Sequence, residues 1–307
     1  MPTPVFRQVS LLPGVWPSPC LLDALRPLSQ RPPLHLTHWP SPDSDTGQSF
    51  ARTDALLAGW KDHLDAERLS QLPALRYVGL RATSTDRVDL DHARREGITV
   101  SPIYGYGDIG TVEFVIEQLL AHTRHSGQTP GELAGRRLGL IGYGPVARRV
   151  AAVATALGMR VLFHTPTPRC TEEGDARWAP LAEVLGSADC LSFHSPAYQH
   201  VVTLKDLRLI PGDAFVVVTT LGLPMAESDL RTWQSGRAGR VSLDSCAAHD
   251  AGDPVQRVPG IDVHDLYAAR TTESVKRAET QLVQNLMAAL RPGAATVSGL
   301  AAQRSSR

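Results

Sequence analysis

A short glycine-bearing turn is the clearest chemical signal in the sequence. Residues 137–141 form an apolar run, Gly142, Gly144 and Ala147 follow with G-x-G-x-x-A spacing, and a helical pattern continues to Leu157. In this context the first glycine permits a tight turn, the second admits a pyrophosphate, and the small third residue permits close helix–strand packing. The turn therefore predicts dinucleotide binding at a helix N-terminus, and the alternative is a glycine-rich turn with an empty site. The expected contacts are Gly142, Tyr143, Gly144, Pro145 and Val146.

The end of the next predicted strand indicates the type of dinucleotide. A carboxylate there would bind a ribose 2′-hydroxyl, but no Asp or Glu occurs before Glu172. Thr165, Thr167 and Arg169 instead offer two hydroxyls and a guanidinium, which suit a 2′-phosphate. NADP is therefore favoured over NAD as the cofactor. The alternative is that Arg169 is a solvated surface arginine.

Strand and helix patterns alternate along most of the chain, which is typical of an α/β fold. The predicted strands are 55–60, 75–81, 98–100, 137–141, 160–164, 190–194, 214–219, 240–244 and 261–264. The predicted helices are 65–72, 89–96, 111–122, 145–157, 181–185, 228–235 and 272–290. Residues 1–43 hold 10 of the 23 prolines, so this segment is predicted to be irregular and exposed, with a short strand within 5–12.

The composition excludes several classes of protein. The 307 residues carry 31 basic and 31 acidic side chains, so nothing favours a nucleic-acid or membrane-surface partner. No apolar run approaches the roughly 18 residues that a spanning helix needs. The four cysteines are far apart in the sequence and the histidines lack metal-ligand spacing, which argues against disulfides and metal sites and favours the cytoplasm.

Taken in order, these motifs resemble the D-2-hydroxyacid dehydrogenase family from about Leu75 onward. The resemblance implies two doubly wound α/β domains with parallel sheets: a discontinuous flavodoxin-like substrate domain of residues 1–102 plus 288–307, and a Rossmann NAD(P)-binding domain of residues 103–287. It also implies a homodimer that pairs through the cofactor domain, a small-molecule substrate, and further cofactor contacts. These contacts are His194, Ser195, Pro196, Thr219, Thr220 and Asp244.

The chemistry that the resemblance implies is hydride transfer between a nicotinamide and a 2-keto or 2-hydroxy acid. It uses a His as acid and base, an Arg for the substrate carboxylate, and a Glu to orient the His. His264 matches the His, although a histidine that only ends a strand would look the same. Leu221 stands at the position of the Arg, and Ala247 at that of the Glu. His249, Asp250 and Asp265 are nearby candidates to replace the Glu.

The predicted substrate loop also departs from the family, and three functions remain open. Hydroxyls of Thr83, Ser84 and Thr85 replace a glycine-rich turn there, with Arg81 beside them. The first function is an NAD(P)H-dependent reductase of a non-standard carbonyl or imine. The second is a conventional 2-hydroxyacid dehydrogenase, of the glyoxylate- or hydroxypyruvate-reductase type, whose arginine is relocated to Arg81 or Arg270. The third is an inactive NAD(P)-binding sensor.

Overall fold

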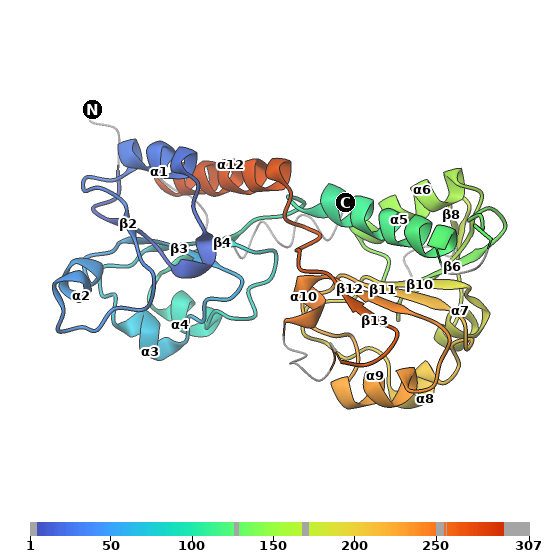
Figure 1. The fold of residues 1–307 in the computed structure, drawn as a ribbon. Helices are drawn as coiled ribbons and strands as arrows, with labels where there is room; N and C mark the ends of the chain where they lie inside the picture. Colours follow the sequence, from blue (N-terminus) through green and yellow to red (C-terminus); the bar gives the residue numbers. More distant parts are fainter. Residues whose placement is uncertain (1–4, 126–128, 168–171, 250–254, 256, 292–307) are drawn as a thin grey trace. The chain divides into compact units, whose positions relative to one another are not determined.

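The chain forms two compact units, each built around its own parallel sheet (Figure 1). A computed structural model describes residues 5–125, 129–167, 172–249, 255 and 257–291. The first unit comprises residues 1–106 and 275–307, and the second comprises residues 107–274. The predicted α/β fold class is confirmed. The predicted domain boundaries, after residues 102 and 287, differ from these divisions.

The first unit is a five-stranded parallel sheet with the strand order β2-β1-β3-β4-β5. Its strands are β1 (Val9–Leu11), β2 (Leu34–His35), β3 (Ala55–Gly59), β4 (Tyr77–Arg81) and β5 (Thr99–Pro102). Helices α2 (Asp45–Phe50), α3 (Ala66–Ser70) and α4 (Leu90–Arg95) cover one face, and α1 (Pro19–Leu25) and α12 (Thr272–Ala289) cover the other (Figure 1). All residues of β3 and β4 are buried, as expected of a sheet covered on both faces.

The short strand predicted within residues 5–12 is confirmed as β1, but the prediction that the proline-rich N-terminal segment is otherwise irregular and exposed was wrong. Phe6, Val9 and Leu11 are buried in the core of the first unit. Proline is compatible with α1 because Pro19 occupies the first helical position, where its missing N–H leaves no unmade helical bond. The hydroxyl of Ser18 caps this helix by accepting the Leu21 N–H at 3.1 Å.

Helix α12 returns the chain from the second unit to the first. A stripe with helical spacing, Ala278, Leu282 and Leu286, is fully buried in the core that α1 and β1 also form. Glu279 of α12 accepts hydrogen bonds from the Ser18 N–H at 2.9 Å and from the Ser18 hydroxyl at 2.6 Å. These contacts place α12 in the first unit.

The second unit contains an eight-stranded sheet with the order β13-β12-β11-β10-β6-β7-β9-β8. Its strands are β6 (Arg137–Ile141), β7 (Arg160–His164), β8 (Glu172–Glu173), β9 (Ala176–Trp178), β10 (Cys190–Phe193), β11 (Phe215–Val218), β12 (Val241–Leu243) and β13 (Ile261–Val263). Seven of these strands are parallel, and only the edge strand β8 pairs in the antiparallel direction.

Helices cover both faces of the second sheet (Figure 1). The helices α5 (Asp108–His125) and α6 (Pro145–Ala156) pack on one face. The helices α7 (Leu181–Ser187), α8 (Leu204–Leu207), α9 (Glu227–Gln234) and α10 (Ser245–Ala248) belong with the other. This arrangement leaves the carboxyl ends of the parallel strands as the expected edge for a ligand.

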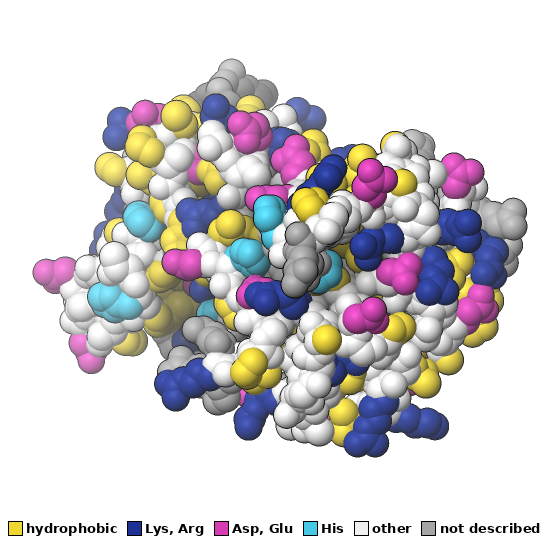
Figure 2. Space-filling model, turned by 45° about the vertical axis from the view of Figure 1, so that its right-hand side comes forward, with side chains coloured by type: hydrophobic (Ala, Val, Ile, Leu, Met, Phe, Trp, Pro, Cys, Tyr) yellow, Lys and Arg dark blue, Asp and Glu magenta, His cyan; other side chains and the backbone are white. Residues whose placement is uncertain are grey.

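Surface charges of both signs are interspersed on the face that Figure 2 shows, in agreement with the zero net charge. Within the described part of the chain, no helix combines the length and apolar character needed to cross a bilayer.

Candidate functional site

The glycine turn between β6 and α6 has the backbone that a dinucleotide requires. Gly142 has a φ of +91°, and a Cβ there would lie 2.3 Å from the carbonyl oxygen of His194. A Cβ at Gly144, by contrast, would meet nothing within 4 Å. Helix α6 begins at Pro145, directly beside this open space, and Ala147 is fully buried against the sheet. The residues present therefore fit a pyrophosphate at the α6 N-terminus.

The segment after β10 forms the other wall of the turn. The His194 N–H donates to Ile141 O at 2.7 Å, and a Cβ at Gly142 would lie 3.2 Å from the backbone nitrogen of Ser195. Burial lowers the pKa of His194 to about 4, so the ring is neutral near pH 7, and its Nε2 lies 3.0 Å from Ser192 Oγ. Ser195 Oγ is buried and has no hydrogen-bond partner among the described residues. A polar ligand at the turn would satisfy it.

Helix α6 carries a cation, Arg148, that the sequence analysis did not single out, and it lies near the aromatic ring of Tyr143. The ring of Tyr143 stacks on Phe163 with centroids 3.7 Å apart, and the Arg148 guanidinium lies 5.6 Å from the Tyr143 centroid. Thr165 and Thr167 follow β7, and the Thr165 carbonyl accepts the Trp178 indole N–H at 3.1 Å. The predicted contact Arg169 lies outside the described residues. Arg148 was missed because it follows the glycine fingerprint, where the motif specifies no residue type.

The loop after β11 holds the residue predicted to replace the catalytic arginine. Leu221 is half-buried, and its carbonyl accepts the Tyr198 N–H at 2.8 Å. Gly222 has a φ of +76°, and its N–H donates to Cys246 O of α10. The predicted contact Thr220 is buried and donates its hydroxyl to Gly222 O at 2.7 Å, while Thr219 is half-buried at the end of β11. The loop thus presents an apolar side chain at the carboxyl edge.

The carboxylate of Asp244, which was predicted to contact the nicotinamide, accepts hydrogen bonds from backbone N–H groups. Its side chain is 1% exposed, and its two oxygens accept the N–H groups of Ala247 and Ala268, each at 2.9 Å. Burial raises the pKa of Asp244 to about 6, although these N–H groups act in the opposite direction. The carboxylate caps α10 and fixes the segment after β13. Ala247, at the position of the family's Glu, is buried in α10.

His264 follows β13, and its ring lies on the α5 face of the sheet. Its Nε2 lies 3.0 Å from Ser242 Oγ, and this hydroxyl donates to Gln118 Oε1 at 3.1 Å. A hydroxyl has one hydrogen, so the network assigns the ring proton to Nε2. Phe114 of α5 contacts the ring edge-to-face at 5.3 Å. These contacts account for the position of the ring without a substrate.

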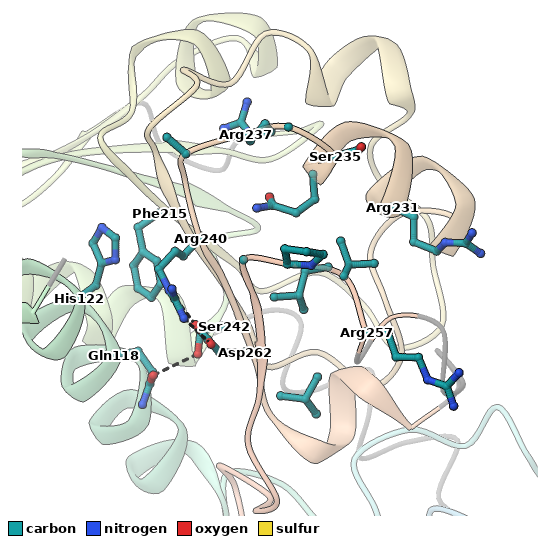
Figure 3. A pocket seen from close by; sticks show the side chains of 18 of the residues that line it. Gln118, His122, Phe215, Arg231, Ser235, Arg237, Arg240, Ser242, Arg257 and Asp262 are labelled. Atoms are coloured by element: carbon teal, nitrogen blue, oxygen red, sulfur yellow. Dashed lines mark hydrogen bonds and ion pairs between the residues drawn. The ribbon is translucent and has the colours of Figure 1, made fainter.

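A groove of about 1730 Å³ runs along the edge strand β13, between α5 and α9 (Figure 3). Its lining residues include His264, the hydrogen-bonded pair Ser242 and Gln118, and the ion pair Arg240 and Asp262. The strands β12, β11 and β10 separate β13 from β6, so this groove and the glycine turn lie at different places on the sheet. The backbone geometry that fits a pyrophosphate belongs to the turn.

The predicted substrate residues of the first unit make contacts within their own unit. Arg81 is 6% exposed and donates to the carbonyl oxygens of Val15 and Trp16. Ser84 Oγ accepts the Asp86 N–H at 3.1 Å and so stabilises its own turn. Thr83 is exposed and Thr85 is half-buried. Arg81 therefore supports the backbone after β1.

Two covered parallel sheets and the glycine turn define a two-unit α/β protein with a dinucleotide-binding domain. Residues 113–263 match the family described as D-isomer specific 2-hydroxyacid dehydrogenase, NAD binding domain. The matched residues lie within the second unit, which is therefore an NAD(P)-binding domain of this family. The family resemblance read from the sequence is thus confirmed.

The chain is similar to some known dehydrogenases and reductases in sequence and to others in fold. A glyoxylate reductase of Aeropyrum pernix is 31% identical over 209 residues, which is 59% of this chain and 62% of the relative. The chain spans less than two thirds of the length of this and other curated relatives. The fold is shared with D-lactate dehydrogenase from Aquifex aeolicus, complexed with NAD and lactic acid (TM-score 0.80, 21% identity, 95% of this chain and 98% of that one). It is also shared with an acyclic imino acid reductase in complex with NADPH and D-Arg (TM-score 0.78, 19% identity, 92% and 97%).

Proposed function

We propose that this protein is an NAD(P)H-dependent reductase whose substrate is not an ordinary 2-keto acid. The observation that carries the proposal is Leu221 at the carboxyl end of β11, beside a dinucleotide turn whose geometry is intact. Leucine cannot pair with a carboxylate or polarise a keto oxygen. An uncharged carbonyl or an imine does not need that clamp, and the acyclic imino acid reductase indicates that this fold accommodates imine chemistry.

The second unit is the cofactor domain in this proposal, and the first unit is the substrate domain. A bound nicotinamide supplies the hydride. The chain has to supply the cradle for the dinucleotide and a proton for the reduced oxygen or nitrogen. Because Ser242 accepts the proton on Nε2 of His264, we assign the proton transfer to Nδ1, which carries a proton to donate when the ring is an imidazolium.

NADP is the favoured cofactor. The end of β7 offers the hydroxyls of Thr165 and Thr167, and Arg148 adds a cation next to the Tyr143–Phe163 stack. Titration of the protein with NADPH and with NADH measures the preference. Binding of NADPH at least about tenfold tighter is expected, since one charge-assisted hydrogen bond contributes roughly 1.5–3 kcal/mol. Equal affinities would contradict the assignment.

The function is tested by NADPH oxidation with a panel of acceptors. We expect turnover with ketones, aldehydes or imines that lack a carboxylate on the reacting carbon, and little with glyoxylate or hydroxypyruvate. Efficient reduction of either keto acid by the unmodified protein would instead support the conventional dehydrogenase with a relocated arginine, which the similarity to glyoxylate reductase favours. In that case the interpretation of Leu221 is wrong.

A second candidate function is an NAD(P)-binding sensor without catalysis. The engagement of His264 Nε2 by Ser242 favours it, because the predicted catalytic histidine then has a structural explanation. This candidate predicts tight NADPH binding with no turnover across the whole panel. Turnover with any acceptor, lost in a His264→Gln variant, would exclude it.

We also propose a homodimer that pairs through α5 and α6, in the cytoplasm. Large apolar side chains are exposed on these helices, among them Ile109 (44%), Leu120 (38%) and Val153 (38%). Light scattering after size exclusion should give twice the 33.2 kDa chain mass. A Leu120→Glu variant should be a monomer, and an unchanged mass in that variant would place the contact elsewhere.

A further inference from the structure

Three side chains gather where β1 and β3 of the first unit end. The ammonium of Lys61 lies 4.9 Å from the ring centroid of Trp60 and 5.6 Å from that of Trp16. All three residues are half-buried. We call Trp16, Trp60 and Lys61 the indole–lysine cluster. It combines a cation with two aromatic walls, an arrangement that keeps the charge close to low-dielectric surfaces.

The backbone at Trp16 is strained. Trp16 has φ +46° and ψ +63°, in the left-handed region that bulky residues rarely adopt. Such conformations persist where surrounding contacts over-determine them, and they concentrate at ligand sites. The strain is therefore a reason to look for a function at this point.

The side chains of Arg81 and Asp62 hold this turn through buried and partly buried hydrogen bonds. The guanidinium of Arg81, at the end of β4, donates to the carbonyls of Val15 and Trp16. The carboxylate of Asp62 accepts the Gly59 N–H at 2.7 Å and the Gly14 N–H at 3.2 Å, and burial raises its pKa.

Close backbone contact fixes the same turn. A Cβ at Gly59 would lie 2.0 Å from Gly14 O, so the turn after β1 packs directly on the end of β3. Trp16 and Lys61 are thus fixed relative to each other by contacts on both sides.

The cluster lies at the edge of the sheet where open α/β folds bind ligands, outside the carboxyl ends of the strands. A lysine ammonium binds phosphate and carboxylate oxygens as a point charge, and flanking indoles exclude water from that contact. We propose that the indole–lysine cluster binds an oxyanion of the substrate, either a phosphate or a carboxylate. This inference rests on the proposed reductase function, and it adds that the substrate carries an anionic group.

The chain offers an internal control for testing this site, because Lys61, Lys205 and Lys276 are its only lysines. The full-length protein is treated with a limiting amine-acylating reagent, and the rate at each lysine is followed by mass spectrometry. The probes are inorganic phosphate, acetate and glycerol at constant ionic strength. We expect at least fivefold protection of Lys61 by phosphate or by acetate, none by glycerol, and none at Lys205 or Lys276. The effective anion identifies the oxyanion. Equal protection at all three lysines, or none at Lys61, overturns the proposal.

A pair of variants separates recognition from folding. Lys61→Gln should abolish the anion's quenching of tryptophan fluorescence and raise its dissociation constant at least tenfold, with an unchanged thermal midpoint. Lys276→Gln, on the exposed side of α12, is the matched control and should bind as the unmodified protein does. Unchanged anion binding by Lys61→Gln also overturns the proposal.

These binding measurements need no turnover. Loss of the oxyanion site with NADPH oxidation intact would therefore count against this inference alone. Binding without any turnover would count against the proposed reaction alone.

Discussion

Two regions of the second sheet differ in what their carboxyl ends offer. At β6, β7 and β10 the backbone is open at Gly144, and Ser195 Oγ has no partner among the described residues. At β11, β12 and β13 the edge carries the apolar Leu221, while both carboxylate oxygens of Asp244 and the Nε2 of His264 are engaged by the protein itself. The first region keeps its hydrogen-bonding capacity for a ligand, and the second uses it to hold the fold. Binding of the cofactor and chemistry on the substrate can therefore change independently.

The largest effect is expected from Gly142→Ala, which should disrupt the glycine turn at the carboxyl ends of β6, β7 and β10. The new Cβ would clash with His194 O, and the φ of +91° would also be strained. NADPH affinity, measured by fluorescence titration, should fall at least about 100-fold, which corresponds to about 2.7 kcal/mol. Gly236→Ala is the control, since φ is +77° there but a Cβ meets nothing within 4 Å. A Gly142→Ala protein that binds NADPH normally would contradict the cofactor site.

His264→Gln tests whether the histidine at the edge of β11, β12 and β13 transfers a proton to the substrate. If Nδ1 of His264 is the donor, kcat should fall about 100-fold, within the range known for general acids. Ser242→Ala is the comparison, because it removes the contacts to Nε2 of His264 and to Gln118 but leaves the imidazole in place. It should lower the free energy of unfolding by about 1 kcal/mol and leave most of kcat. Unchanged turnover in His264→Gln would show that this histidine is structural.

Leu221→Arg should make the edge at β11, β12 and β13 resemble that of an ordinary 2-keto acid reductase. A guanidinium at this position can pair with a substrate carboxylate. We expect kcat/KM for glyoxylate to rise about tenfold, equivalent to about 1.4 kcal/mol. Leu221→Met, which adds no charge, should leave it unchanged. An equal response of both variants would mean that the charge at this position is irrelevant.

The smallest effect concerns the buried carboxyl of Asp244. Its pKa is about 6 in the folded protein, against 3.8 ordinarily, so the folded state keeps a proton that the unfolded state loses. Stability should therefore fall as the pH rises from 4 to 6, by up to about 1 kcal/mol per pH unit. Asp244→Asn cannot ionise and should flatten this slope in chemical denaturation at pH 5 and pH 6. The same slope in both proteins would refute the assignment.

The sequence predicted the periodic elements well, because their signals are local. The strand 160–164 was predicted with the bounds that the structure has, and the long helix at 272–290 ends one residue earlier. The short elements α1, α2, α8 and α10 were missed. They are four to seven residues long, and they are stabilised by caps and tertiary packing more than by pattern.

The glycine turn was predictable from spacing because backbone geometry restricts its residue types. The environments of His264, Asp244 and Arg81 were not predictable. Each depends on partners distant in sequence, such as Gln118, Ala268 and Val15, which only the folded chain brings together. The type of a polar residue indicates which hydrogen bonds it can make, but its partners in the folded chain decide whether it holds the structure together or contacts a ligand.

The return of α12 to the first unit affects how the protein is made. The buried stripe of Ala278, Leu282 and Leu286 leaves the ribosome only after the whole second unit has been synthesised. The NAD(P)-binding domain is contiguous and can fold as soon as it emerges. The sheet of the first unit, although translated before the second unit, has one apolar face that only α1 covers until α12 has been synthesised. The half of the molecule that is made first is therefore completed last, and during that interval it is the part most exposed to aggregation and most dependent on chaperones.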